Sequence, residues 1–226
     1  MNQVLTWNQV FQTLSEGRLT PEIETFLLIT SLSFIPFFLI AATTFTRNII
    51  VFSFLRSALG LQQTPPNMVL LTLAMFLTIF TMEPIFLKSF DSGISPYLKE
   101  EISFDIAIEK SWKPFQNFMI KQTNESDIQL IYKLSEKKLP SIATDVPAVQ
   151  LIPAFLLSEL RTAFKIGFII YLPFLLIDFV ISALLMSLGM IMVPPITISL
   201  PLKIMLFVVV DGWSLIAETL IHSVSG

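Results

Sequence analysis

Four long apolar runs alternate with polar stretches along the chain. They cover residues 26–45, 68–87, 166–193 and 196–221. Each run reaches or exceeds the roughly 20 residues that an α-helix needs to cross a hydrocarbon core of about 30 Å. Paired prolines at 65–66 and 194–195 separate the runs, because proline lacks the backbone donor that a helix interior requires. The pattern therefore predicts two apolar helical hairpins, over residues 26–87 and 151–226.

A polar stretch over residues 88–150 separates the two hairpins. It holds 17 of the chain's 31 charged residues, eight basic and nine acidic. Apolar positions within 112–138 recur at helical spacing on either side of a break at Thr123 and Asn124, which predicts two amphipathic helices. We therefore expect an all-α integral membrane protein in which two apolar hairpins flank a polar helical insert.

The N-terminal residues and the connection at 46–67 predict the orientation. Residues 1–25 form a polar segment without the basic and short apolar regions of a signal peptide, so we interpret the run at 26–45 as a first spanning helix rather than a cleaved leader. The connection contains Arg47 and Arg56 and no acidic residue, and such connections tend to stay cytoplasmic. We expect the insert in the periplasm and the two arginines on anionic headgroups, or else on carboxylates of a partner.

The composition fits a membrane protein and argues against several other classes. Hydrophobic residues make up 54% of the chain and charged residues 14%, against about 25% charged in an average soluble domain. A net charge of −3 gives no electrostatic basis for binding nucleic acid. With no cysteine and a single histidine, His222, one chain offers no thiolate or histidine cluster for a metal. Phosphate-binding loops and hydrolase motifs are missing too, so we expect no enzyme activity and no cofactor.

Asp178 stands near the middle of the third apolar run. A charge at that depth costs about 2.5–3.5 kcal/mol on insertion scales, so such residues face protein or water rather than lipid. Three interpretations are open: contact with backbone donors of a neighbouring subunit, a polar partner for a kink at Pro173, or one member of a proton path. We favour the first, because a proton relay needs more than one polar group.

Glu159 and Lys203 lie toward the edges of the two arms of the second hairpin. Burying an unpaired charge is strongly destabilising, so we expect these two side chains to pair within or between subunits. An equally open alternative is that Glu159 pairs locally with Arg161 or Lys165, while Lys203 extends its amine to a lipid headgroup.

Met186, Met190 and Met192 cluster before the second proline pair. Met186 and Met190 would share one face if the helix continued through both positions. Methionine is flexible and polarisable, which suits a surface that closes on itself and then around a passing polypeptide. Ile191 between them is β-branched and stiffer. Composition alone favours the plainer interpretation, in which these methionines fill a membrane core.

Several long strings in the chain resemble one known family. They lie at 45–67, at 118–135 (FMIKQTNESDIQLIYKLS), at 153–160 (PAFLLSEL), at 163–168 (AFKIGF) and at 209–213 (VVDGW). These strings resemble the FliP family, which is the P subunit of the bacterial flagellar protein export gate, and its relatives in virulence-type III secretion. The similarity covers most of the chain beyond residue 26.

The resemblance implies both an assembly and a function. In the FliP family, five P subunits assemble with one R and several Q subunits into a helical pore, through which unfolded substrates cross the bacterial inner membrane at the flagellar basal body. The family's constriction lies at the methionine turn, which would make Met186, Met190, Ile191 and Met192 the pore gate. The alternative is a proton- or ion-coupled transporter that uses the three membrane charges as a relay. Such transporters usually have two related halves, and this sequence shows no internal repeat.

Overall fold

The computed structural model of the chain describes residues 29–30, 33, 35–140 and 146–225. It divides into two compact units, Met1–Leu39 and Ile40–Gly226. The polar segment predicted at 1–25 and the beginning of the first apolar run lie outside the described residues. Every regular element among the described residues is a helix, which confirms the all-α prediction.

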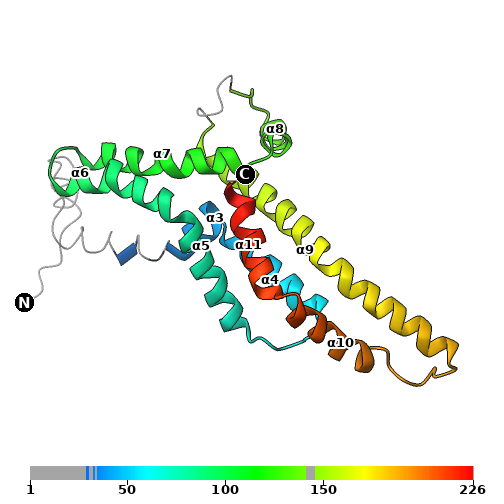
Figure 1. The fold of residues 1–226 in the computed structure, drawn as a ribbon. Coiled ribbons are helices and arrows are strands. Elements are labelled where there is room, and N and C mark those ends of the chain that lie inside the picture. The colour runs from blue at the N-terminus through cyan, green and yellow to red at the C-terminus, as the bar shows by residue number, and fades with distance from the viewer. Residues whose placement is uncertain (1–28, 31–32, 34, 141–145, 226) are drawn as a thin grey trace, which may run out of the picture. The chain divides into compact units, whose positions relative to one another are not determined.

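Figure 1 shows these helices in chain order. Helix α3 (Ile35–Ala42) begins in the first unit and ends in the second. The others are α4 (Phe45–Ala58), α5 (Asn67–Ser89), the π-helix η1 (Phe90–Ile94), α6 (Ser95–Leu98), α7 (Phe104–Gln122), α8 (Glu125–Leu134), α9 (Ala148–Ser187), α10 (Ile196–Val209) and α11 (Gly212–Ser225). Most of the described residues in the long apolar runs are helical, but the first run breaks at Thr43 and Thr44, the third ends its helix at Ser187, and the fourth breaks between α10 and α11.

Two helical stretches of the described residues are long and apolar enough to cross a membrane. They are Asn67–Leu98, which joins α5, η1 and α6, and α9. Helices α10 and α11 meet at 63° and add a further span if the pair counts as one. The first stretch passes residues 87 and 88 without a break, so the border predicted there between hairpin and insert falls inside a helix.

Helix α9 ends at Ser187, earlier than the apolar pattern predicts. Gly189 takes a positive φ of 70°, and the Met190 N–H donates to the Leu185 carbonyl at 2.9 Å. This is the Schellman arrangement, in which a glycine with positive φ closes a helix. The chain therefore leaves the helix before the proline pair and turns into α10.

Helix α4 packs along α9, in the most extensive helix contact of the second unit. The approach is close at Gly167 of α9, where an added Cβ would lie 2.7 Å from the ring of Phe54. The core around this contact includes Val51, Phe52, Leu55 and Ala58 of α4, Leu70 and Ala74 of α5, Ala163 and Phe174 of α9, Phe207 of α10, and Ile216 and Leu220 of α11. The two predicted hairpins therefore share one core.

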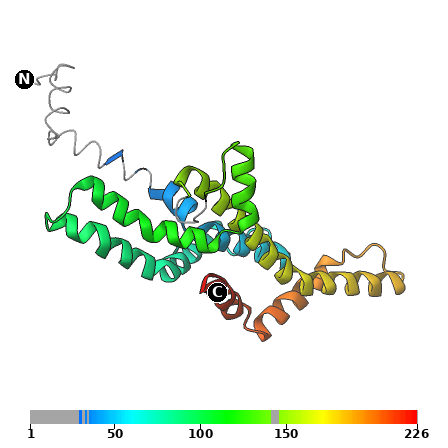
Figure 2. The ribbon, with the colours of Figure 1, turned by 90° about the horizontal axis from the view of Figure 1, so that it is seen from above.

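The polar insert contributes α7 and α8. Both views show α7 beside the second half of α5 (Figures 1 and 2). Phe115, Phe118 and Met119 form the buried side of α7, as their spacing predicts. Thr123 and Asn124 take extended backbone between α7 and α8, which confirms the predicted break.

Candidate functional site

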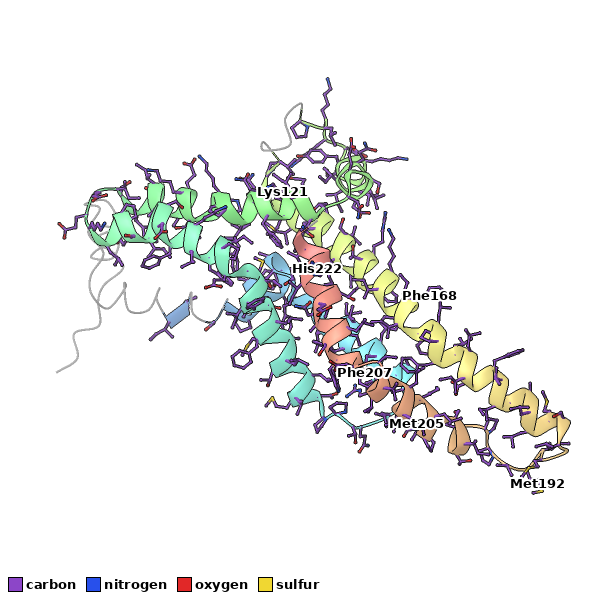
Figure 3. All side chains as sticks on the ribbon, viewed as in Figure 1. Lys121, Phe168, Met192, Met205, Phe207 and His222 are labelled. Atoms are coloured by element: carbon purple, nitrogen blue, oxygen red, sulfur yellow. The ribbon has the colours of Figure 1, made fainter. Side chains whose placement is uncertain are left out.

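The predicted gate residues lie together at the α9–α10 connection. Figure 3 labels Met192 at the tip of this connection, beyond the end of α9. The exposed fractions are 70% for Met186, 44% for Met190, 85% for Ile191 and 96% for Met192. Four large apolar side chains are thus presented to the surroundings at one end of the hairpin, so within a single chain they are not core filler.

Met186 and Met190 do not share a helical face, because the helix does not continue through both positions. Met186 belongs to α9, but the helix ends at the next residue and Gly189 turns the chain away. Met190, Ile191 and Met192 therefore lie in an irregular turn rather than on a continued helix. Apolar side chains on a turn can contact neighbouring surfaces in several directions, whereas those on a helix face lie along a single line.

Arg47 and Glu159 form a buried ion pair. The Arg47 Nε donates to Glu159 Oε2 at 3.0 Å, and Nη2 pairs with Oε1 of the same carboxylate. The side chains are 1% and 0% exposed. Arg47 also donates to the Ser223 carbonyl at 2.8 Å and to Gln122 Oε1 at 3.0 Å. This buried network ties together α4, α7, α9 and α11.

The structure corrects the prediction for Arg47 and refines that for Arg56. Arg47 is buried against protein and does not reach a headgroup. It also contacts Gln122 of the insert, so it cannot mark the side of the membrane opposite to the insert. Arg56 lies nine residues further along α4, and at about 100° per residue it faces the opposite side of the helix. Its Nη1 donates to Asn67 Oδ1 at 2.5 Å and to the Pro65 carbonyl at 3.4 Å.

Lys203 pairs with Asp178 and not with Glu159. Its Nζ lies 2.5 Å from Asp178 Oδ2 and donates to the Ala58 carbonyl at 3.0 Å. The Lys203 side chain is 4% exposed and that of Asp178 is 41% exposed. The predicted pair fails for a simple reason: the 19 residues from Glu159 to Asp178 along α9 span about 28 Å, and α10 approaches the Asp178 end.

Asp178 accordingly finds its partner within the chain. Lys203 is a partner that none of the three interpretations from the sequence named, and contact with a neighbouring subunit, a role at Pro173 and a proton path all stay predictions. Through Lys203, Asp178 is linked to the last turn of α4, because Ala58 is the C-terminal residue of that helix. A cation there is favourable, since helix carbonyls and the helix dipole leave negative charge at a C-terminus. The cluster therefore fixes α4, α9 and α10 together.

Asp127 of α8 is bound from two sides, which the sequence did not indicate. Its Oδ2 accepts from Ser158 Oγ at 2.6 Å and its Oδ1 from Arg161 Nη2 at 2.5 Å. Ser158 Oγ in turn accepts from the Asn124 N–H at 2.9 Å. Arg161 thus fixes α8 on α9 rather than pairing locally with Glu159, and that alternative is also wrong.

These charged clusters hold helices together. Among the described residues, no group of three or more His, Asp or Glu side chains could hold a metal ion. Each membrane charge named above has an opposite charge beside it. At this end of the molecule, the described surface offers other molecules the apolar turn and the apolar faces of α9 and α10.

Comparisons with known proteins match this chain to one family. The model of the FliP family matches residues 28–220. A flagellar biosynthetic protein FliP of Buchnera aphidicola subsp. Baizongia pistaciae is 50% identical over 201 residues, which is 89% of this chain and 56% of the relative. That of Pectobacterium carotovorum is 49% identical over 206 residues, or 90% of this chain and 79% of the relative. That of Bacillus subtilis is 44% identical over 214 residues, or 95% and 97%. The chain thus spans little more than half of the Buchnera protein.

Proposed function

Because the chain belongs to the FliP family, we propose that it is a core subunit of a flagellar-type (type III) protein export gate. In this role several copies, five by the family pattern, surround a channel together with Q and R subunits. Unfolded export substrates pass through the channel across the bacterial inner membrane at the flagellar basal body.

The observation that carries the channel role is the exposed turn. Met192 is 96% exposed and Ile191 is 85% exposed, which is an unfavourable state for large apolar side chains in water. Copies of the turn arranged around an axis would bury these side chains against one another. A narrow apolar constriction gates a pore by excluding water, so such a ring is closed to ions without any plug.

The residue types at the turn suit this role. Methionine side chains have rotatable bonds and a polarisable sulfur, so they adapt to surfaces of different shape. A ring of them can seal when empty and still yield to a polypeptide. Ile191 is stiffer at χ1, so we expect this gate to be somewhat less compliant than one with methionine throughout.

The outer faces of α9 and α10 support an assembly of several chains. Large apolar side chains there are mostly exposed, including Phe168 at 63%, Phe179 at 70%, Val208 at 70% and Val209 at 77%. Soluble monomers rarely show apolar surface of this extent. Sibling subunits and lipid together would cover it.

The competing function, a proton- or ion-coupled transporter, is less well supported. It would use Glu159, Asp178 and Lys203 as a relay. Glu159 is engaged with Arg47, while Asp178 and Lys203 form a second pair. About 28 Å of α9 separates the two carboxylates, too far for direct proton transfer. These contacts favour a role in holding helices together.

Native mass spectrometry tests the proposed assembly. The tagged chain is co-expressed with its neighbouring Q and R membrane subunits and purified in detergent. We expect one complex that contains five copies of this chain together with both partners. Purification of the chain as a monomer or dimer without Q and R, under conditions where those subunits are expressed, would contradict the proposal.

A further inference from the structure

A groove of about 990 Å³ runs between α5 and α7 and belongs to none of the features described so far. It is lined by Pro84, Ile85, Lys88, Ser92, Lys110, Lys113, Pro114, Asn117, Phe118, Ile120 and Lys121. Four of these residues are lysines and none is acidic. Figure 3 labels Lys121 near the end of α7. The groove thus combines a cationic rim with a largely apolar floor.

The shape of the groove is fixed by the π-helix η1. Ser89 Oγ donates to the Ser111 carbonyl at 2.8 Å, and Ser92 Oγ donates to the Lys110 carbonyl at 3.0 Å. Next to Ser92, Gly93 lets the two helices approach so closely that an added Cβ would lie 2.1 Å from Ser111 Oγ. Single π-helical turns occur frequently at functional sites. Here the turn holds Lys110 of α7 against the end of α5.

The positive charge of the groove is largely uncompensated. Lys113 pairs with Glu109 at 3.0 Å, with both side chains more than half exposed. Among the described residues, no ion pair reaches Lys88, Lys110 or Lys121. Three like charges around one groove repel one another, and an anion between them would relieve this repulsion.

A neighbouring face of α5 carries a second, apolar groove of about 670 Å³. Phe76, Phe80 and Leu87 line it and are 62%, 62% and 56% exposed. One acidic residue, the exposed Glu83, also lies in its lining. Helix α5 lies in one of the two described stretches long and apolar enough to cross a membrane. An apolar helix face that ends in a cluster of lysines matches the chemistry of a lipid with an anionic headgroup.

We propose that the α5–α7 groove binds an anionic phospholipid. The phosphate lies at the end of the groove near Lys88 and Lys110, Lys121 adds positive charge about 16 Å further along α7, and the acyl chains follow the apolar face of α5. Free phosphate would leave the apolar floor unused, and an acidic protein segment would not need the exposed Phe76 and Phe80. The proposal depends neither on the export function nor on which leaflet supplies the lipid.

The test uses the intact chain purified in a neutral detergent. Native mass spectrometry counts bound lipid during titration with phosphatidylglycerol or with phosphatidylcholine of the same chain length. The test variant combines Lys88→Gln, Lys110→Gln and Lys121→Gln. The matched control combines Lys133→Gln, Lys137→Gln and Lys138→Gln, which remove the same charge from exposed positions outside the groove. Circular dichroism checks that both variants keep their helix content.

We expect phosphatidylglycerol to bind tighter than phosphatidylcholine. The groove variant should lose at least about tenfold in phosphatidylglycerol affinity, since each lysine near an anionic surface contributes appreciably, while the control stays within about twofold of the original chain. Equal binding of the two lipids, or an equal loss in both variants, would overturn the proposal. Displacement of the lipid by millimolar inorganic phosphate would assign the groove to a free anion, and displacement by an acidic peptide to a protein partner. A groove variant that loses its helix content is replaced by Lys110→Gln alone, which should still weaken phosphatidylglycerol selectively.

Discussion

The pair of Arg47 and Glu159 shows how a buried charge is used in this chain. Both side chains are almost fully buried, and the remaining Arg47 donors go to Ser223 and Gln122. A buried pair adds little net stability over an apolar pair, because desolvation offsets the attraction. We infer that the pair instead selects one arrangement, because four helices must meet to satisfy a single guanidinium.

Glu159→Ala should destabilise the chain strongly. The substitution leaves the Arg47 charge buried without its counter-ion, and breaking a buried pair costs about 3–5 kcal/mol. The free energy of unfolding can be measured by titrating the detergent-solubilised chain with SDS and following helix content.

Lys113→Ala supplies the matched control, because its pair with Glu109 is exposed and such pairs contribute about 0–1 kcal/mol. Replacing Arg47 and Glu159 together by leucine should recover much of the loss, since no charge then stays buried alone. A Glu159→Ala variant as stable as the Lys113→Ala control would show that the buried pair is absent.

The sequence identified the charges that need partners but assigned the partners wrongly. Depth in an apolar run is a local property, so Asp178, Glu159 and Lys203 could be identified from the pattern. Their partners depend on tertiary packing: Arg47 lies 112 positions from Glu159 in the chain. The pairing followed from α4 lying along α9, and no spacing rule contains that information.

At the level of elements, the contact of α4 with α9 depends on a small residue at the crossing. Gly167 faces the Phe54 ring, which also makes an edge contact with Phe164 at a centroid distance of 5.1 Å. In an unhindered helix interior, glycine to alanine stabilises by about 1 kcal/mol. Whether Gly167→Ala raises or lowers the stability therefore reports whether the two helices are in close contact.

Gly167→Ala should destabilise the chain rather than stabilise it. The new Cβ would lie 2.7 Å from the Phe54 ring, and overpacking of this kind costs about 1–3 kcal/mol. In a Phe54→Ala background the same substitution should cost little, because the ring is gone. Thermal unfolding of the original chain, the two single variants and the double variant measures the stability change from Gly167→Ala with and without the Phe54 ring. A gain in stability from Gly167→Ala in the original chain would mean that the two helices do not approach as described.

Elements were predictable where local signals decide them. The break at Thr123 and Asn124 followed from apolar spacing on either side. The end of α9 could not be predicted from apolar spacing, because the apolar run continues past Ser187. The helix is closed by Gly189, which takes a positive φ of 70°. A glycine within an apolar run can be tolerated or can end a helix, and the pattern alone does not distinguish the two.

At the scale of the whole molecule, the side of the membrane on which each part lies can be measured. Arg47 no longer supports a cytoplasmic position, but Arg56 lies toward the other end of α4, and we still expect that end to be cytoplasmic. Since the chain has no cysteine, Ser57→Cys and Ser126→Cys are clean probes at two exposed positions. A membrane-impermeant thiol reagent added to intact cells should label the position in α8 and spare the one in α4.

Labelling in lysed cells serves as the integrity control, because both cysteines should then react if they remain accessible. Equal labelling of the two variants in intact cells would refute the orientation. Labelling of the α4 position alone would reverse it and would place the insert in the cytoplasm.

We propose that the methionine turn closes a channel, and single-channel conductance measures this closure. Met190→Ala combined with Met192→Ala removes side-chain volume from every copy of the turn. Since these side chains are 44% and 96% exposed, the loss should not unfold the chain, and the yield of assembled complex should stay normal. The control combines Met68→Ala with Met205→Ala, which are 72% and 60% exposed and lie away from the turn. Figure 3 labels Met205 on α10.

Complexes of the original chain, the turn variant and the control are inserted into planar bilayers, and their ion leakage is recorded without substrate. We expect the original complex and the control to stay closed and the turn variant to conduct, because a widened apolar constriction fills with water. A turn variant that assembles in normal yield and stays closed would show that these methionines do not close the channel.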